Sequence, residues 1–188
     1  LARIFYEFEK WAQILEVRDV GALNNQIAAG RGSELIRIAE ALHEKKIGQI
    51  ADQISLDRER IRVILVAGPS SSGKTTFAQR LAVQLRVNGL KPISISMDNY
   101  FIDRERTPCS SDGAPDYECL EAIDLQLFNE QLTALIQGFA VKLSLYNFQT
   151  GHREWQDQPI SITKEQPVII EGIHGLNDRL TTAIPKDN

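Results

Sequence analysis

The sequence is poor in several features that mark common classes of protein. It holds two cysteines, Cys109 and Cys119, among 188 residues, and without metal-ligand spacing they are expected to be free thiols in a reducing cytosol. No apolar run approaches the roughly 20 residues that cross a membrane, and the net charge of -4 lacks the basic excess of a nucleic-acid binder. We therefore expect a soluble, cytoplasmic protein without a membrane or a direct nucleic-acid partner. Whether it forms a homo-oligomer stays open.

The first third of the chain has a helical pattern and no catalytic constellation. Apolar residues recur at intervals of three and four in successive stretches, and Ser33 is expected to cap the last of these helices. We expect residues 1–57 to form a helical linker or extension and residues 58–188 a second domain. Since the chain begins with Leu1 rather than Met, and its start does not resemble a signal peptide, we also expect a piece of a longer protein.

From residue 61 onward, short β-branched segments alternate with helical ones. This alternation predicts a parallel sheet in an α/β architecture. We expect a first strand at 61–67, a helix from 76, a second strand at 91–98 and a long loop at 99–118. A helix at 125–137 follows, capped by Asp124 and ended by Gly138. After it we expect an antiparallel meander through 141–162 that turns at Thr150-Gly151, and a buried strand at 167–170.

Residues 68–75 read Gly-Pro-Ser-Ser-Ser-Gly-Lys-Thr, which matches the phosphate-binding loop pattern G-x-x-x-x-G-K-[ST] between a strand and a helix. The glycines let backbone N–H groups turn toward an anion, and the following helix adds its positive dipole end. Lys74 supplies a mobile cation and Thr75 a hydroxyl for magnesium. The residues expected to bind ATP are Gly68, Ser70, Ser71, Ser72, Gly73, Lys74, Thr75 and Thr76.

Two acids follow apolar strands of the expected sheet. Asp98 ends the second strand and Glu171 the buried one, and ligands of open α/β sheets bind at the carboxyl ends of strands. Mg²⁺ prefers oxygen ligands, so Thr75, Asp98 and Glu171 are the expected metal set. Asp98 can also accept the proton of an attacking hydroxyl, with Lys74 as its catalytic partner. Taken alone, Asp98 beside Asn99 is equally compatible with a simple turn.

Five blocks of the sequence together resemble one known family. The blocks are GPSSSGKTTFAQRL, SMDNYF, PDYECLEAIDLQLF, YNFQTGHR and VIIEGIHG, in this order between about residues 61 and 180. They are similar to the uridine kinase and phosphoribulokinase-like P-loop kinases. The resemblance implies a P-loop NTPase fold of the nucleoside-monophosphate-kinase type with an inserted β-hairpin or meander. It also implies transfer of the ATP γ-phosphoryl group, with Mg²⁺, to a nucleoside 5'-hydroxyl, a pyrimidine nucleoside being preferred.

The resemblance also implies a set of acceptor-binding residues. Tyr146 would contact the base, Arg153 holds the matching basic place, and Glu118 stands where uridine kinases carry an aspartate that grips the ribose. Strand packing is the alternative for Tyr146 and Phe148, and a solvated loop carboxylate for Glu118. Tyr100, with Phe101, is expected to wall the acceptor pocket beside Asp98. The residues expected to bind the substrate are Tyr100, Glu118, Tyr146, Phe148, His152 and Arg153.

The chain departs from the family pattern in several places. Where classical uridine-cytidine kinases have a histidine after the Y-x-F block, this chain has Gly151, and His152 lies one residue later. The helical preface resembles the connecting part of longer bacterial nucleoside kinases with a threonyl-tRNA-synthetase-like N-terminal extension, and the family's later strands and arginine-bearing lid are absent from the sequence.

Two other functions stay open beside the nucleoside kinase. One is a kinase for another small alcohol, such as a phosphopentose or pantothenate, since the run from Glu171 to Gly175 resembles an E-G-x-H pattern of phosphoribulokinases. The other is a non-catalytic ATP-binding regulatory module, which the helical preface suggests. A panel of acceptors and an Asp98 variant separate these functions.

Overall fold

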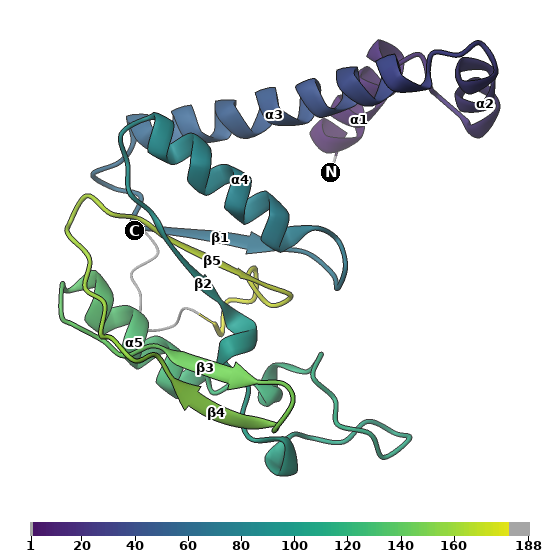
Figure 1. Ribbon diagram of the computed structural model, residues 1–188. Helices are drawn as coiled ribbons and strands as arrows, with labels where there is room; N and C mark the ends of the chain where they lie inside the picture. The colour runs from purple at the N-terminus through teal and green to yellow at the C-terminus, as the bar shows by residue number, and fades with distance from the viewer. Residues whose placement is uncertain (1, 181–188) are drawn as a thin grey trace. The chain divides into compact units, whose positions relative to one another are not determined.

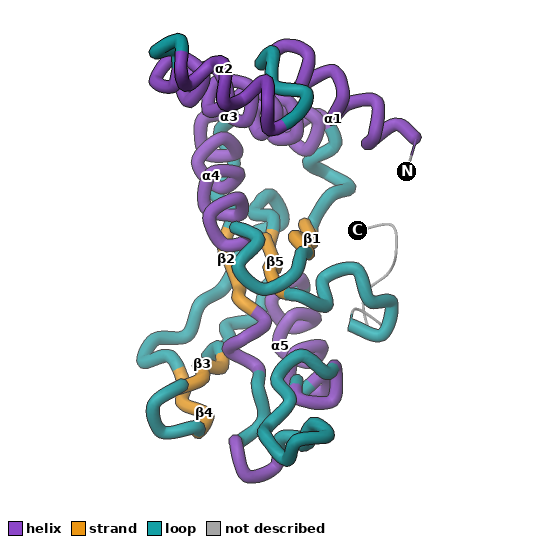
Figure 2. The backbone as a smooth tube through the Cα atoms, turned by 90° about the vertical axis from the view of Figure 1, so that its right-hand side faces the viewer, coloured by secondary structure: helices purple, strands orange, loops and turns teal. Residues whose placement is uncertain are grey.

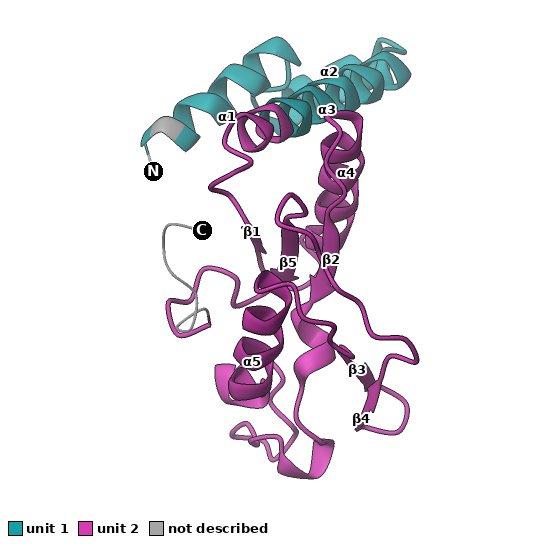
Figure 3. Ribbon diagram, turned by 90° about the vertical axis from the view of Figure 1, so that its left-hand side faces the viewer, with its two compact units in different colours: residues 1–49 teal, residues 50–188 magenta. Residues whose placement is uncertain are grey.

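The computed structural model describes residues 2–180 and divides the chain into two compact units, residues 1–49 and 50–188 (Figure 3). No helix within the described residues is both long and apolar enough to span a membrane. The expected domain boundary at 57/58 stays a prediction. Cys109 and Cys119 are free thiols.

The first unit is helical, as expected (Figure 2). It contains α1 (Ala2–Ile14), α2 (Val20–Ala28) and the start of α3 (Gly32–Leu56). Asp19 begins α2, because its side chain accepts a hydrogen bond from Ala22 N at 2.7 Å. Ser33 lies inside the first turn of α3 rather than at the cap expected from the sequence.

The second unit is built on a three-stranded parallel sheet. Its strands are β1 (Val63–Ala67), β5 (Val168–Gly172) and β2 (Ile93–Ser96), in the order β1-β5-β2. All five residues of β5 are buried, as the apolar run predicts for a central parallel strand. This confirms the predicted α/β fold with a parallel sheet.

Helices cover both faces of this sheet (Figure 1). α4 (Lys74–Val87) packs on one face with Ala78, Leu81 and Leu85 buried. α5 (Leu125–Ile136) lies on the other side, where its apolar residues join the main core with β2 and β5. Asp124 caps α5 by accepting from Leu127 N at 3.0 Å, and Gly138 follows its end with φ of +86°, both as expected.

Two elements differ from their sequence-based bounds. β2 stops at Ser96, and a 3-10 turn, η1 (Met97–Tyr100), follows, so Asp98 lies in a turn after the strand. The expected meander is a hairpin of β3 (Ser144–Asn147) and β4 (His152–Trp155), with the turn between them ending at Gly151 as predicted. Ile160 forms only an isolated bridge with Val141. Two further 3-10 turns, η2 (Arg104–Arg106) and η3 (Leu120–Ala122), lie in the long loop and just after it.

Candidate active site

The glycine-rich loop lies where the sequence predicts it, between the end of β1 and the start of α4. Gly73 begins α4 with a left-handed φ of +86°, a conformation that glycine adopts without steric cost. A Cβ on Gly68 would lie 2.7 Å from Ser72 Oγ, so the loop closes tightly there. Among the described residues no side chain caps the first turn of α4, which leaves its N–H groups for an anion.

The polar side chains of this loop line an exposed surface. Lys74 Nζ donates to the Pro69 carbonyl at 2.9 Å, so its ammonium lies over the loop. Thr75 follows it in the first turn of α4 and is exposed. The other exposed residues of the predicted ATP-binding set are Ser70, Ser71, Ser72, Gly73 and Thr76.

Two carboxylates lie at the same edge of the sheet as this loop. Glu171 is 8% exposed and pairs in register with Ser96, two residues before Asp98. Burial raises the pKa of the Asp98 carboxyl above its ordinary value of 3.8, the charge of Glu171 raises it further, and Lys74 lowers it. The charges of two other segments, Glu171 at the end of β5 and Lys74 at the start of α4, therefore both act on the Asp98 carboxyl.

The donors at this edge fit a magnesium ion. Thr75, Asp98 and Glu171 all offer oxygen atoms, the ligand type that Mg²⁺ prefers. Within the described residues no group of three or more His, Cys, Asp and Glu side chains forms a metal cage. A magnesium ion here would complete its shell with phosphate and water oxygens, as it does in many phosphoryl-transfer sites.

An aromatic cluster lies beyond Asp98 along the chain. It consists of Phe101, Tyr117, Tyr146 and Phe148, whose rings meet edge to face with centroids between 5.0 and 6.4 Å apart. Asn99 connects η1 to the hairpin, because its Oδ1 accepts from Tyr146 N at 3.4 Å and its carbonyl accepts from Ser144 Oγ at 2.7 Å. The predicted base-binding residue Tyr146 thus lies in a segment bonded to the neighbour of Asp98.

The other predicted substrate residues lie outside the aromatic cluster, and two of them face acidic side chains. Arg153 pairs with Asp124, Nη2 to Oδ2, at 2.8 Å. His152 lies 3.6 Å from Asp103 and 3.9 Å from Glu105. Glu118 is an exposed loop residue.

The structure corrects the prediction for Tyr100. This side chain is 1% exposed, and its hydroxyl donates to Gln131 Oε1 of α5 at 2.9 Å. Its ring packs edge to face on Phe128. Tyr100 therefore stabilises the core, and we remove it from the proposed substrate site.

Sequence reasoning overlooked two residues of this region. Tyr117 joins the aromatic cluster, and its hydroxyl lies 3.4 Å from that of Tyr146. Asp124 was expected only as a helix cap, yet it also pairs with Arg153. Only the position of Tyr117 directly before Glu118 could have signalled its role.

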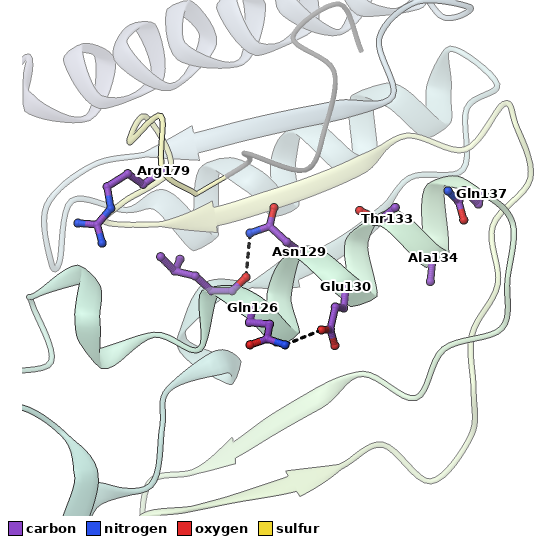
Figure 4. A pocket seen from close by; sticks show the side chains of 8 residues that line it. Gln126, Asn129, Glu130, Thr133, Ala134, Gln137 and Arg179 are labelled. Carbon is purple, nitrogen blue, oxygen red and sulfur yellow. Dashed lines mark hydrogen bonds between the residues drawn. The ribbon is translucent and has the colours of Figure 1, made fainter.

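A separate hollow of about 590 Å³ lies beside α5 (Figure 4). It is lined by residues of α5, by Gln137 directly after this helix and by Arg179, and no predicted site residue lines it. Asn129 Nδ2 donates to the carbonyls of Leu125 and Leu180, and Glu130 Oε1 accepts from Gln126 Nε2. We therefore place the candidate active site at the glycine-rich loop and not in this hollow.

Comparison with known proteins identifies the family of this chain. Residues 63–184 match the profile of the "Phosphoribulokinase / Uridine kinase family". The chain belongs to this family. Among the family's curated members, the uridine kinase of Ureaplasma parvum is 28% identical over 122 residues, which is 65% of this chain and 58% of the relative. The uridine kinase of Deinococcus deserti is 31% identical over 116 residues, 62% of this chain and 54% of the relative.

The chain spans little more than half the length of these uridine kinases. A solved structure from Bacillus stearothermophilus, described as a possible uridine kinase, aligns with a TM-score of 0.54 at 22% identity and covers 66% of this chain and 67% of that one. This likeness confirms the P-loop kinase fold. The threonyl-tRNA-synthetase-like extension stays a prediction.

Proposed function

We propose that this chain carries the core of an ATP-dependent kinase that transfers the γ-phosphoryl group to the 5'-hydroxyl of a nucleoside, with a pyrimidine nucleoside preferred. The observation that carries the proposal is the position of Asp98 and Glu171 at the same edge of the sheet as the glycine-rich loop, where the charges of Glu171 and Lys74 both act on the Asp98 carboxyl. The family membership of residues 63–184 supports it. We further propose that residues 1–57 form an extension and residues 58–188 the kinase domain, which acts in the cytoplasm.

In this proposal the glycine-rich loop binds the donor. The N–H groups of Ser72, Gly73 and the first turn of α4 surround the phosphates, and Lys74 moves from the Pro69 carbonyl to the outer phosphate oxygens. Its positive charge stabilises the negative charge that develops on the transferred group. Thr75, Asp98 and Glu171 would hold Mg²⁺, which neutralises phosphate charge when bound.

Asp98 is the proposed general base. Its carboxylate takes the proton of the acceptor 5'-hydroxyl as that oxygen bonds to the γ-phosphorus, and the bond from phosphorus to the β,γ-bridging oxygen breaks to leave ADP. Tyr146 and Phe148 would hold the base of the nucleoside, and Glu118, His152 and Arg153 lie around it in the proposal.

The proposal is tested with the full-length protein, Mg-ATP and a panel of acceptors. The panel contains uridine, cytidine, their deoxy forms, a phosphopentose and pantothenate, and the assay measures ADP together with the phosphorylated product. We expect nucleoside 5'-monophosphates. If only the phosphopentose or pantothenate is phosphorylated, the acceptor is another small alcohol and not a nucleoside. If ATP binds and no product forms, a regulatory module is favoured.

Asp98→Asn tests the proposed base directly. We expect turnover to fall by about two to four orders of magnitude, the usual contribution of general-base catalysis, while calorimetry still detects nucleotide binding. Asp157→Asn, at an exposed position outside the site, is the matched control and should leave turnover unchanged. Equal turnover of Asp98→Asn and the unaltered protein would refute the role of Asp98.

A further inference from the structure

Arg104 is an exposed arginine that three hydrogen bonds hold in place. Its backbone N donates to the Gly151 carbonyl at 2.9 Å, which joins the start of η2 to the hairpin turn. Its Nη2 donates to the Phe148 carbonyl at 2.6 Å, and its Nε donates to the Tyr117 hydroxyl at 3.3 Å. Exposed arginines usually keep their rotamer freedom, so a guanidinium fixed at two points is preorganised.

Gly151 makes this position accessible to Arg104. A Cβ on Gly151 would lie 2.9 Å from Arg104 Cβ, Cζ and Nε, and the φ of +79° at Gly151 disfavours other residues as well. The guanidinium therefore occupies space that any larger residue at position 151 would fill. The turn and the arginine fit together only because position 151 has no side chain.

The guanidinium lies at the edge of the aromatic cluster. Tyr117, which accepts its Nε hydrogen, also lies within 3.4 Å of the Tyr146 hydroxyl. Phe148, whose carbonyl accepts the Nη2 hydrogen, is 58% exposed, so its ring offers an open face for a planar ligand. A base stacked on Phe148 would place its edge within reach of the guanidinium.

We propose that Arg104 is a specificity-determining residue that donates a hydrogen bond to the 4-carbonyl of a uracil base; this rests on the proposed nucleoside kinase function. A guanidinium has five N–H donors and no acceptor, and the two bonds to Phe148 and Tyr117 use two of the donors. Uracil offers a carbonyl oxygen at position 4, whereas cytosine has an amino group there. Arg104 therefore favours uridine over cytidine.

The bonds of the two segments to the hairpin support this assignment of the 4-position. Asn99, the neighbour of Asp98, is bonded to Ser144 and Tyr146 of β3, whereas Arg104 is bonded to Phe148 and Gly151 in the turn that follows β3. The sugar of a pyrimidine nucleoside is attached at N1, and C4 is the ring atom opposite N1. An acceptor with its 5'-hydroxyl at Asp98 thus turns its 4-substituent away from the reacting end and toward Arg104.

The test compares kcat and KM for uridine and cytidine in the full-length protein. We expect the unaltered protein to prefer uridine. Glutamine carries both a donor and an acceptor, so we expect Arg104→Gln to raise KM for uridine by about tenfold or more, the usual effect of one lost specific contact. KM for cytidine should stay equal or fall, and kcat should change little. Arg104→Lys keeps the charge without the planar fork, and we expect it to lower the uridine preference too.

Arg106→Gln is the matched control, since Arg106 is an exposed arginine in the same 3-10 turn, and it should leave the preference unchanged. Thermal unfolding of each variant shows whether it folds. If Arg104→Gln does not fold, the nucleoside preference of Arg104→Lys is compared with that of the unaltered protein instead. If Arg104→Gln and Arg104→Lys change uridine and cytidine equally, the inference fails while the nucleoside kinase stands. If neither nucleoside is phosphorylated by the unaltered protein, both proposals fail.

Discussion

At the scale of single residues, Gly172 allows the two acids of the site to approach each other. It ends β5 directly after Glu171, and a Cβ at this position would lie 2.6 Å from Met97 Sδ and 2.7 Å from Met97 Cβ. Met97 is fully buried and directly precedes Asp98 in η1. The close packing of Gly172 on Met97 therefore sets the separation of Glu171 from Asp98.

We expect Gly172→Ala to damage catalysis more than nucleotide binding. The added methyl group must displace Met97, and with it Asp98, at a cost of about 1–3 kcal/mol of folding stability for an overpacked site. We expect kcat for the proposed phosphoryl transfer to fall at least tenfold while ATP affinity changes little, because the glycine-rich loop lies in another segment. Urea unfolding, steady-state kinetics and calorimetry measure the three effects.

Gly32→Ala is the control for this substitution. A Cβ at Gly32 meets nothing within 4 Å, and its φ needs no glycine, so stability should change by less than about 0.5 kcal/mol. A Gly172→Ala variant with unaltered kcat would show that the packing against Met97 does not position Asp98.

At the scale of elements, Asp124 joins α5 to the β3–β4 hairpin. One carboxylate oxygen accepts from Leu127 N at 3.0 Å and so caps α5, while the other pairs with Arg153 of β4 at 2.8 Å. The Arg153 and Asp124 side chains are 23% and 27% exposed, so this pair is better shielded from water than a surface salt bridge. One short side chain thus supports two elements.

Two substitutions separate these two contributions. We expect Asp124→Asn to keep the cap and lose the ion pair, at a cost of about 1.5–3 kcal/mol for a charge-assisted hydrogen bond. Asp124→Ala should lose about 1 kcal/mol more, because the cap is lost as well. Urea unfolding of the two variants measures both costs. Equal stability of Asp124→Asn and Asp124→Ala would mean that the cap contributes nothing.

Local patterns in the sequence predicted the elements well, because each rests on a few adjacent residues. The left-handed Gly73 before α4, the Asp124 cap and the buried run of β5 follow from such patterns. The placement of Tyr100 does not. Tyr100 was expected beside Asp98 only because it follows that residue closely in the chain. In a 3-10 turn, side chains two positions apart point about 120° away from each other, and the observed η1 turns Tyr100 into the core.

The acceptor side depends on contacts between distant segments, which local patterns do not encode. Arg104 contacts Phe148 across more than forty positions of the chain, and Gly151 is adjacent to it only through the hairpin turn. The proposed role of Arg104 in base recognition becomes visible only when the loop at 99–118 is placed against β3 and β4.

At the scale of the whole second unit, the buried phenol of Tyr100 makes stability fall in alkaline solution. Burial raises the pKa of the Tyr100 phenol well above its ordinary value of 10.0, with a smaller opposing effect of Arg153. Above the ordinary pKa the unfolded chain releases this proton, while the folded chain keeps it. Because the folded state then binds more protons, the free energy of unfolding decreases as pH rises, and below that pKa the effect is absent.

Comparison of the unaltered protein with Tyr100→Phe checks this effect. We expect the urea midpoint of the unaltered protein to fall more steeply than that of Tyr100→Phe between about pH 9 and about pH 11. At neutral pH the variant should be less stable by about 0.5–1.5 kcal/mol, since it lacks the hydrogen bond to Gln131. Parallel curves for the two proteins across this range would contradict a raised pKa at Tyr100.

The position of β5 in the middle of the sheet has a consequence for synthesis on the ribosome. β1 and β2 each pair with β5 and not with each other, and Val63 meets Val168, more than a hundred positions later in the chain. Pairings this distant form slowly, and until β5 has been translated both earlier strands have unpaired edges open to aggregation. The strand that precedes the glycine-rich loop therefore gains its first sheet neighbour late, and the edges of β1 and β2 stay unpaired in the nascent chain until residues 168–172 have emerged.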